Sequence, residues 1–348
     1  MQPVQLNYRI LGPSGLRVSE MCLGAMTFGT EWGWGADADE VRRILDTFAA
    51  SGGNFLDTAD FYTGGTSERL LGAALEGGRD RWVLTTKYSL HRNADDPNAQ
   101  GNHRKNLTRA VEASLRRLQT DYIDLLWVHA WDFTIREDDL LWALEHLTRS
   151  GKVLHIGISD TPAWIVSSAN AIARTRGWQG ITALQLEYSL KERTGERELL
   201  PMAQAVDLGV VAWSPLASGV LTGKYAADTP TGSRRAAGYP IEIADRTKAV
   251  AQRVRDIAER RGSTPAQVAL AWVLARRDPV VIPILGARTT AQLEENLAAR
   301  NVVLTGAEVT ALDAASAVDL GFPHDFLRSD LAQFALWGNV RSRVLTRV

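Results

Sequence analysis

Residues 53–62 read GNFLDTADFY, a short apolar run that ends in the carboxylate of Asp57 and continues into a polar loop. Two later runs end in the same way, WVLTTK at Lys87 and YIDLLWVH at His129. Short apolar runs bounded by turn residues are typical of strands that are buried on both faces. Three successive strands therefore deliver an Asp, a Lys and a His to one edge of a parallel sheet.

The same pattern continues along most of the chain. Strands are predicted at 18–23, 53–57, 82–87, 122–129, 153–158, 183–187, 209–213 and 280–285. Helices are predicted between them, with apolar residues three and four apart on one face in 39–51 and 137–149. Eight βα units predict an α/β fold, a (β/α)8 TIM barrel. An open doubly wound sheet stays possible, but residues 24–29, GAMTFG, lack the glycine spacing of its dinucleotide-binding turn.

Other features complete the predicted domain. Residues 8–18 predict an N-terminal β-hairpin, and residues 214–240, rich in small residues, predict a long loop after strand seven. Thr161-Pro162 and Thr264-Pro265 are typical of an N-cap followed by proline at the first helical position. We expect one domain over 1–348, with the tail 320–348 near the barrel mouth.

Composition excludes several classes of protein. The formal net charge is −1 and no long run of like charge occurs, which argues against nucleic acid or an anionic membrane as a partner. The single cysteine, Cys22, permits no internal disulfide. The N-terminus has no apolar segment typical of a signal peptide, so we expect a cytoplasmic protein. No protein partner is evident, and no metal-ligand motif occurs.

The residues at the strand ends suggest proton chemistry. Tyr62 follows Asp57 by five residues, in the loop after that strand. A nearby Lys87 ammonium favours the phenolate, so we expect the pKa of Tyr62 to fall and the phenol to act as a general acid. His129 could orient a carbonyl oxygen. Each residue alone has an ordinary structural explanation, but their joint position on one rim favours an active site.

These segments resemble signatures of the aldo-keto reductase family, with FLDTADFY at 55–62, TTK ending at Lys87 and WVH ending at His129. The resemblance covers about residues 8–300. It implies a catalytic tetrad of Asp57, Tyr62, Lys87 and His129, with Tyr62 as the proton donor. It also implies NADPH as cofactor and a small-molecule carbonyl compound, aldehyde or ketone, as substrate.

The resemblance extends to segments that bind the cofactor, including GISD at 157–160, WSPLASGVLTGKY at 213–225 and GAR at 286–288. The implied cofactor-binding residues are Ser159, Asp160, Gln185, Trp213, Ser214, Leu216, Gly219, Lys224, Arg234, Gly286, Arg288, Gln292, Glu295 and Asn296. Asp160 departs from the family, which usually has Asn there. Arg288 and a helix N-terminus at Thr289 or Thr290 would suit the 2′-phosphate of NADPH.

Aromatic residues cluster in the predicted rim loops, and Phe28, Trp32 and Trp131 are the predicted lining of an apolar substrate pocket. Two alternatives to a general carbonyl reductase stay open. One is a nucleotide-sensing regulatory subunit with slow turnover. The other is a sugar-nucleotide reductase, for which Arg92, His103, Arg104 and Lys105 are candidate diphosphate ligands.

Overall fold

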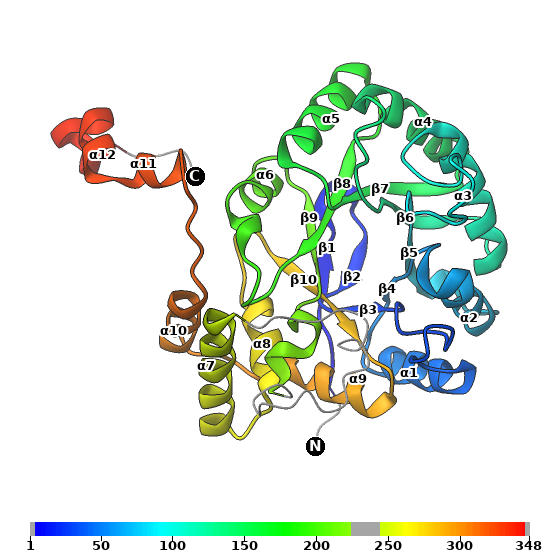
Figure 1. Ribbon diagram of the computed structural model, residues 1–348, viewed down its shortest axis with the longest axis horizontal. Helices are drawn as coiled ribbons and strands as arrows, with labels where there is room; N and C mark the ends of the chain where they lie inside the picture. The colour runs from blue at the N-terminus through cyan, green and yellow to red at the C-terminus, as the bar shows by residue number, and fades with distance from the viewer. Residues whose placement is uncertain (1–3, 224–243, 345–348) are drawn as a thin grey trace.

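Parallel strands close into an eight-stranded barrel in the computed structural model, which describes residues 4–223 and 244–344 (Figure 1). Around the barrel the strands follow chain order, and the last pairs with the first. They are β3 (Cys22–Gly24), β4 (Phe55–Asp57), β5 (Val83–Tyr88), β6 (Ile123–Val128), β7 (Val153–Ser159), β8 (Ile181–Glu187), β9 (Gly209–Trp213) and β10 (Val281–Gly286). The predicted (β/α)8 barrel is confirmed.

Helices surround the barrel (Figure 1). They are α1 (Ala38–Ala50), α2 (Thr66–Ala74), α3 (Arg104–Leu118), α4 (Glu137–Arg149), α5 (Ala163–Arg176), α6 (Leu199–Ala205), α7 (Asp245–Arg261), α8 (Pro265–Leu274), α9 (Thr290–Leu297) and α10 (Gly306–Ser316). The apolar stripes predicted in 39–51 and 137–149 are the buried faces of α1 and α4. Thr264 caps α8 with a reciprocal bond to Gln267, as expected of a capping box.

The predicted strand at 18–23 is two strands. Its first part, β2 (Arg17–Ser19), pairs antiparallel with β1 (Tyr8–Ile10), and only Cys22–Gly24 joins the barrel. The hairpin therefore confirms the expectation for 8–18 but extends one residue further. Its apolar residues Leu11 and Val18 are fully buried and pack against side chains of the barrel interior, so the hairpin closes the amino end of the barrel.

The N-cap predicted at Thr161 is wrong. Helix α5 begins two residues later, after Pro162, and the Thr161 hydroxyl donates to the carbonyl oxygen of Ser159 at 2.7 Å. The local hydrogen bond within the turn replaces the expected cap, as threonine hydroxyls often do. After β9, the described part of the predicted loop contains the short 3-10 segment Ala217–Thr222, and residues 224–243 lie outside the described part of the chain.

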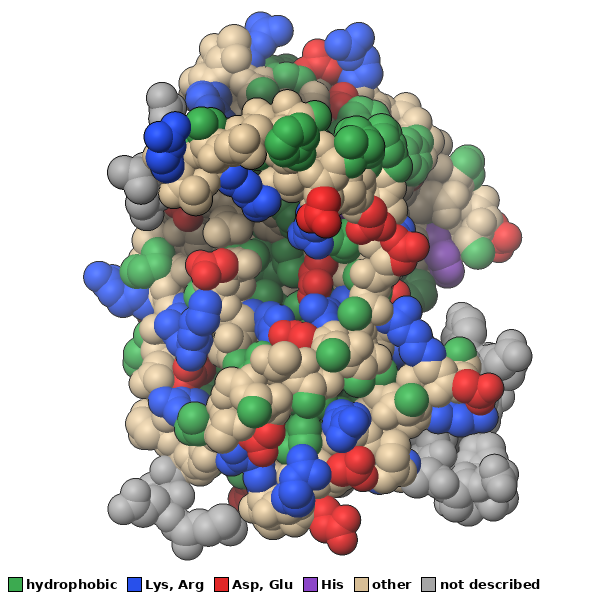
Figure 2. Space-filling model, turned by 90° about the vertical axis from the view of Figure 1, so that its left-hand side faces the viewer, with side chains coloured by type: hydrophobic (Ala, Val, Ile, Leu, Met, Phe, Trp, Pro, Cys, Tyr) green, Lys and Arg blue, Asp and Glu red, His purple; other side chains and the backbone are tan. Residues whose placement is uncertain are grey.

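The C-terminal tail contains α11 (His324–Arg328) and α12 (Asp330–Trp337), which lie apart from the barrel beyond α6 and α10 (Figure 1). Arg197 donates to the carbonyl oxygen of Asp319, and His324 lies 2.8 Å from Glu198. Many large apolar side chains of the tail are exposed. Figure 2, viewed from the side on which the tail lies, shows groups of apolar side chains on the upper part of that face.

Candidate active site

The four predicted catalytic side chains meet at the carboxyl rim of the barrel. Asp57 is the last residue of β4, Lys87 lies one residue before the end of β5, and His129 directly follows β6. Adjacent parallel strands bring these positions into register, since Asp57 pairs with Thr85 on the next strand. Tyr62 begins the 3-10 turn Tyr62–Gly65 that follows β4. The carboxyl ends of barrel strands are where this fold carries its chemistry.

The ammonium of Lys87 connects the other groups. It donates to the carboxylate of Asp57, to the carbonyl oxygen of Thr58 at 2.9 Å and to the hydroxyl of Tyr62 at 3.1 Å. A lysine has three donors, so all of them are engaged. Lys87 and Asp57 are almost completely buried. The ion pair is therefore fixed in place, with Thr85 also donating to Asp57 at 2.8 Å.

The proton of Tyr62 stays on the phenol at neutral pH. Burial raises the pKa of Tyr62, and the nearby Lys87 ammonium offsets this only in part, so the net shift is upward. The expectation of a lowered pKa is wrong for the protein described here, because desolvation of the phenolate outweighs the attraction of one ammonium. Burial alone would lower the pKa of Lys87, but Asp57 and Tyr62 raise it above its ordinary value.

His129 is a neutral imidazole beside Tyr62. The two rings are 5.9 Å apart and nearly perpendicular. Burial, and then the charge of Lys87, hold the pKa of His129 well below its ordinary value. Its Nδ1 is buried and has no hydrogen-bond partner among the described residues. A neutral imidazole offers one donor and one acceptor nitrogen.

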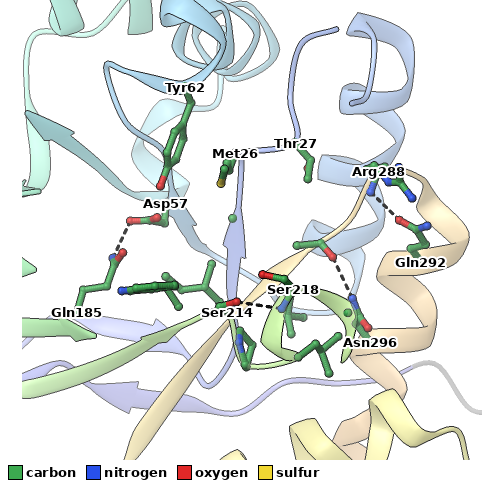
Figure 3. Close-up of a pocket in the computed structure, with 18 of the residues that line it drawn as sticks. Met26, Thr27, Asp57, Tyr62, Gln185, Ser214, Ser218, Arg288, Gln292 and Asn296 are labelled. Atoms are coloured by element: carbon green, nitrogen blue, oxygen red, sulfur yellow. Dashed lines mark hydrogen bonds between the residues drawn. The ribbon is translucent and has the colours of Figure 1, made fainter. Parts of the chain in front are cut away.

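A cavity of about 740 Å³ opens above this group and runs to the end of β10. Asp57, Tyr62 and His129 line one end, and Gly286 and Arg288 lie at the other. Figure 3 shows labelled residues of both ends around the same space. The predicted cofactor-binding residues that line it are Ser159, Asp160, Gln185, Trp213, Ser214, Leu216, Gly219, Gly286, Arg288, Gln292, Glu295 and Asn296. Lys224 and Arg234 lie outside the described residues.

Polar groups near the catalytic end face this cavity. Gln185 donates from Nε2 to Asp57 at 3.1 Å (Figure 3), which leaves its amide oxygen as an acceptor. The hydroxyl of Ser159 is buried and has no partner within the described chain. Asp160 accepts a hydrogen bond from the indole nitrogen of Trp213 at 3.1 Å. Burial raises the pKa of Asp160, although the Trp213 bond partly opposes this.

The far end of the cavity is organised by side chains of α9. Gln292 accepts from the backbone nitrogen of Arg288 at 2.9 Å, and Asn296 donates to the carbonyl oxygen of Gly286 at 3.2 Å (Figure 3). Thr289 is the N-cap of this helix and accepts from Gln292. Arg288 is half-buried and forms no ion pair with any residue that the structure describes.

The N-terminus of α9 is not free, contrary to the expectation that it offers amides to a phosphate. The carboxylate of Glu40, from α1, accepts hydrogen bonds from both the backbone nitrogen and the hydroxyl of Thr290. The first of these bonds, and then the guanidinium of Arg43, lower the pKa of Glu40. A negative charge already occupies the position that favours anions.

The predicted substrate-pocket residues are not those that line the cavity. Phe28 is completely buried, and neither Trp32 nor Trp131 lies on the cavity wall. The apolar wall beside Tyr62 comes instead from Met26, Trp34, Phe61 and Leu90. Trp32 packs behind it, with ring centroids 5.6 Å from Trp34 and 6.2 Å from Phe61. The position of Phe61 directly before Tyr62 is the sequence signal that could have identified it.

The candidate diphosphate ligands have other roles. Arg92 faces Asp60 at 3.7 Å, His103 caps α3, and Arg104 lies over the ring of Trp142 at 4.3 Å. None of these residues, nor Lys105, lines the cavity. The polar mouth that a sugar nucleotide would need is therefore not formed by them.

A closed barrel with a Lys–Asp–Tyr–His group at its carboxyl rim and a long adjoining cavity defines a class of barrel oxidoreductases. The model of the aldo/keto reductase family matches residues 20–317, and the chain belongs to this family. No helix among the described residues combines the length and the hydropathy needed to cross a membrane.

Relatives of this chain carry the names of reductases and dehydrogenases. The chain is 40% identical to norsolorinic acid reductase A of Aspergillus parasiticus, over 93% of its own length and 85% of the relative. It is 38% identical to an aryl-alcohol dehydrogenase of Pestalotiopsis microspora, over 92% of this chain and 85% of the relative. The aldo-keto reductase ausK of Aspergillus calidoustus is 36% identical, over 93% of this chain and 86% of the relative. These names support an oxidoreductase.

Proposed function

We propose that this chain reduces the carbonyl group of an aromatic aldehyde or ketone to an alcohol, with NADPH as reductant and Tyr62 as proton donor. The observation that carries the proposal is the ammonium of Lys87, which bonds both the carboxylate of Asp57 and the hydroxyl of Tyr62 beneath an open cavity. A buried ion pair that also bonds a phenol on the wall of a cavity is typical of a functional site.

The residues along the cavity fit a nicotinamide dinucleotide. The buried, unpartnered hydroxyl of Ser159 and the free amide oxygen of Gln185 suit a carboxamide, which both donates and accepts. The indole of Trp213 offers a flat surface beside them. At the other end Arg288 suits a 2′-phosphate. When bound, NADPH supplies the hydride that reduces the carbonyl carbon.

The protein's own groups handle the proton. Tyr62, protonated at neutral pH because burial raises its pKa, donates to the carbonyl oxygen as negative charge develops there. The ammonium of Lys87 then stabilises the phenolate, and Asp57 keeps that ammonium charged and in place. The neutral imidazole of His129 can donate one hydrogen bond to the same oxygen and so fix its direction.

The wall of the cavity near Tyr62 supports an aromatic substrate. Met26, Trp34, Phe61 and Leu90 are all apolar, and they line the same cavity as Tyr62 and His129. Aromatic rings pack favourably on one another at the separations found here. The relatives named for norsolorinic acid and aryl alcohols are consistent with such a substrate.

Steady-state oxidation of NADPH with a panel of aromatic ketones, aromatic aldehydes, aliphatic aldehydes and sugars tests the proposal. We expect turnover with the aromatic carbonyls at the highest kcat/KM. A regulatory sensor would instead oxidise bound NADPH in a single slow turnover and show no sustained rate. Absence of multiple turnover with every member of the panel would reject the proposal.

A further inference from the structure

Two loops that wall the cavity are joined by adjacent contacts beside Tyr62. One loop follows β4 and contains Asp60 and Phe61, and the other, residues 89–103, connects β5 to α3 and contains His91 and Arg92. Arg92 Nη1 lies 3.7 Å from Asp60 Oδ2. One residue along each loop, the rings of Phe61 and His91 are 5.3 Å apart and nearly perpendicular. An ion pair and a ring contact therefore hold the two loops together.

These contacts directly flank residues that face the cavity. Phe61 and Tyr62 follow Asp60 in the first loop, and Leu90 lies just before His91 in the second. Phe61, Tyr62 and Leu90 all line the cavity. Movement of the 89–103 loop would consequently change the width of the cavity beside the phenol without displacing Lys87 or Asp57.

The carboxyl group of Asp60 is buried and accepts no hydrogen bond from the described residues. Its side chain is about 1% exposed, and neither carboxylate oxygen has a hydrogen-bond partner among the described residues. Its backbone nitrogen donates to the carbonyl oxygen of Lys87 at 3.1 Å, a bond that any residue except proline would make. A buried carboxylate that accepts no hydrogen bond is costly even beside a guanidinium, so an aliphatic residue would be favoured here if packing were the only requirement.

Arg92 is the cation available to Asp60. The other guanidinium nearby, that of Arg117, donates to Glu68 at 2.6 Å, and Thr86 donates to the same carboxylate. Arg117 and Glu68 therefore form an ion pair of their own. The hydroxyl of Tyr88, which also faces this region, donates to the carbonyl oxygen of Asn102.

We propose that Asp60 is a positioning residue, which acts through Arg92 to hold the 89–103 loop against the Tyr62 loop and so sets the width of the substrate end of the cavity. The substrate readout rests on the proposed function, whereas the loop contact itself does not. Ionised Asp60 attracts Arg92, and protonated Asp60 loses that attraction.

The charge of Asp60 changes near neutral pH. Burial, and then the charge of Glu68, raise the pKa of Asp60 to about 7, although Arg92 and Arg117 partly oppose this. His129, Tyr62 and Lys87 do not titrate there, since the pKa of His129 is lowered well below its ordinary value and those of Tyr62 and Lys87 are raised. The loop contact is thus strengthened above about pH 7 and weakened below it.

Kinetics across pH 5.5–8.5 with one bulky aromatic ketone and one small aldehyde test the proposal. We expect the KM of the wild-type protein for the bulky ketone to change by about 2- to 5-fold as pH passes 7, the size typical of one partly exposed ion pair. Asp60→Asn should keep the low-pH KM at every pH. Arg92→Gln should do the same, and Arg92→Lys should restore the pH dependence. The KM for the small aldehyde and the affinity for NADPH should change little.

Two matched variants separate this effect from others. Asp96→Asn removes the charge of a partly exposed aspartate in the same loop, where Arg109 lies 3.4 Å from Asp96, and should behave as wild type. His91→Phe keeps a ring against Phe61 but removes an imidazole, a group that in general changes charge near neutral pH. If the change of KM near pH 7 disappears in His91→Phe and persists in Asp60→Asn, the proposal that Asp60 causes this change is overturned.

Amide hydrogen exchange of residues 89–103 tests the contact without turnover. At pH 8, Asp60→Asn should lower protection of this segment relative to wild type, and Asp96→Asn should not. Equal protection in Asp60→Asn and wild type would reject the positioning role even in an active enzyme. If the wild-type protein reduces no carbonyl, the proposed function fails while this exchange measurement still decides the role of Asp60.

Discussion

Gln185 donates from its side-chain amide to Oδ1 of Asp57 at 3.1 Å, so a residue of the proposed cofactor site is bonded to the buried ion pair of the active site. Asp57 Oδ1 also accepts from Thr85, and its other oxygen accepts from Lys87. The bond orients the amide of Gln185, because a carboxylate accepts only from the nitrogen. The amide oxygen is then directed away from Asp57.

Gln185→Leu removes both functions of this amide. We expect NADPH affinity to fall by about 2- to 13-fold, the effect of losing one neutral hydrogen bond worth roughly 0.5–1.5 kcal/mol. The rate at saturating NADPH should fall less, because Lys87 and Thr85 still hold Asp57. Fluorescence titration with NADPH measures the first effect. Unchanged affinity would show that Gln185 serves only Asp57.

The pair formed by Asp160 and Trp213 predicts a coupled effect on cofactor binding. Asp160→Asn retains an oxygen that can accept from the indole nitrogen, so NADPH affinity should be near that of wild type. Asp160→Ala and Trp213→Phe each remove the bond, and we expect the double variant to be no weaker than the worse single variant. A double-mutant cycle on NADPH affinity measures this coupling. Fully additive losses would show that the bond does not position the ring.

Cofactor preference should depend on opposing charges at the far end of the cavity. Arg288→Ala should weaken the binding of NADPH by about 10- to 150-fold, as expected for the loss of charge-assisted bonds worth roughly 1.5–3 kcal/mol. It should weaken the binding of NADH much less. Glu40 places a carboxylate on the N-terminus of α9, two residues beyond Arg288. Glu40→Gln should therefore increase the preference for NADPH. Titration of both cofactors against each variant tests this, and equal effects on NADH and NADPH would contradict it.

Lys87→Met should lower carbonyl reduction and move its pH dependence. Without the ammonium, the buried phenol of Tyr62 loses the charge that partly offsets the upward shift of its pKa. Reduction requires the protonated phenol, so the fall in rate at alkaline pH should move to higher pH, while the phenol becomes a weaker acid. We expect a loss of about 10²–10⁴-fold. A wild-type rate and profile under conditions where chemistry limits turnover would exclude Lys87 from the reaction.

The barrel could be predicted from the sequence because strand ends follow a local pattern. Asp57, Lys87 and His129 each terminate an apolar run, and the parallel arrangement brings such ends together. Boundaries were less accurate where the chain turns without periodicity. Ser19 and Cys22 belong to different sheets, since the intervening residues carry the chain from the hairpin into the barrel.

The remaining features depend on burial and on contacts between distant residues. Nothing local in the sequence indicates that desolvation outweighs Lys87 at Tyr62, or that Glu40 reaches Thr290 across 250 positions. Trp34 lines the cavity and Trp32 does not. Both lie in an irregular loop, where no regular spacing of residues predicts which side chains face the cavity. The pairing of Asp60 with Arg92 is hidden for the same reason.

The central claim is that Tyr62 donates the proton in carbonyl reduction, and Tyr62→Phe tests it most directly. The measurement is NADPH oxidation with the best aromatic carbonyl of the panel, under conditions where chemistry limits turnover, together with NADPH affinity from fluorescence titration. We predict that the variant loses about 10²–10⁴-fold in rate and binds NADPH nearly as wild type does. A variant that retains more than half of the wild-type rate would contradict the account.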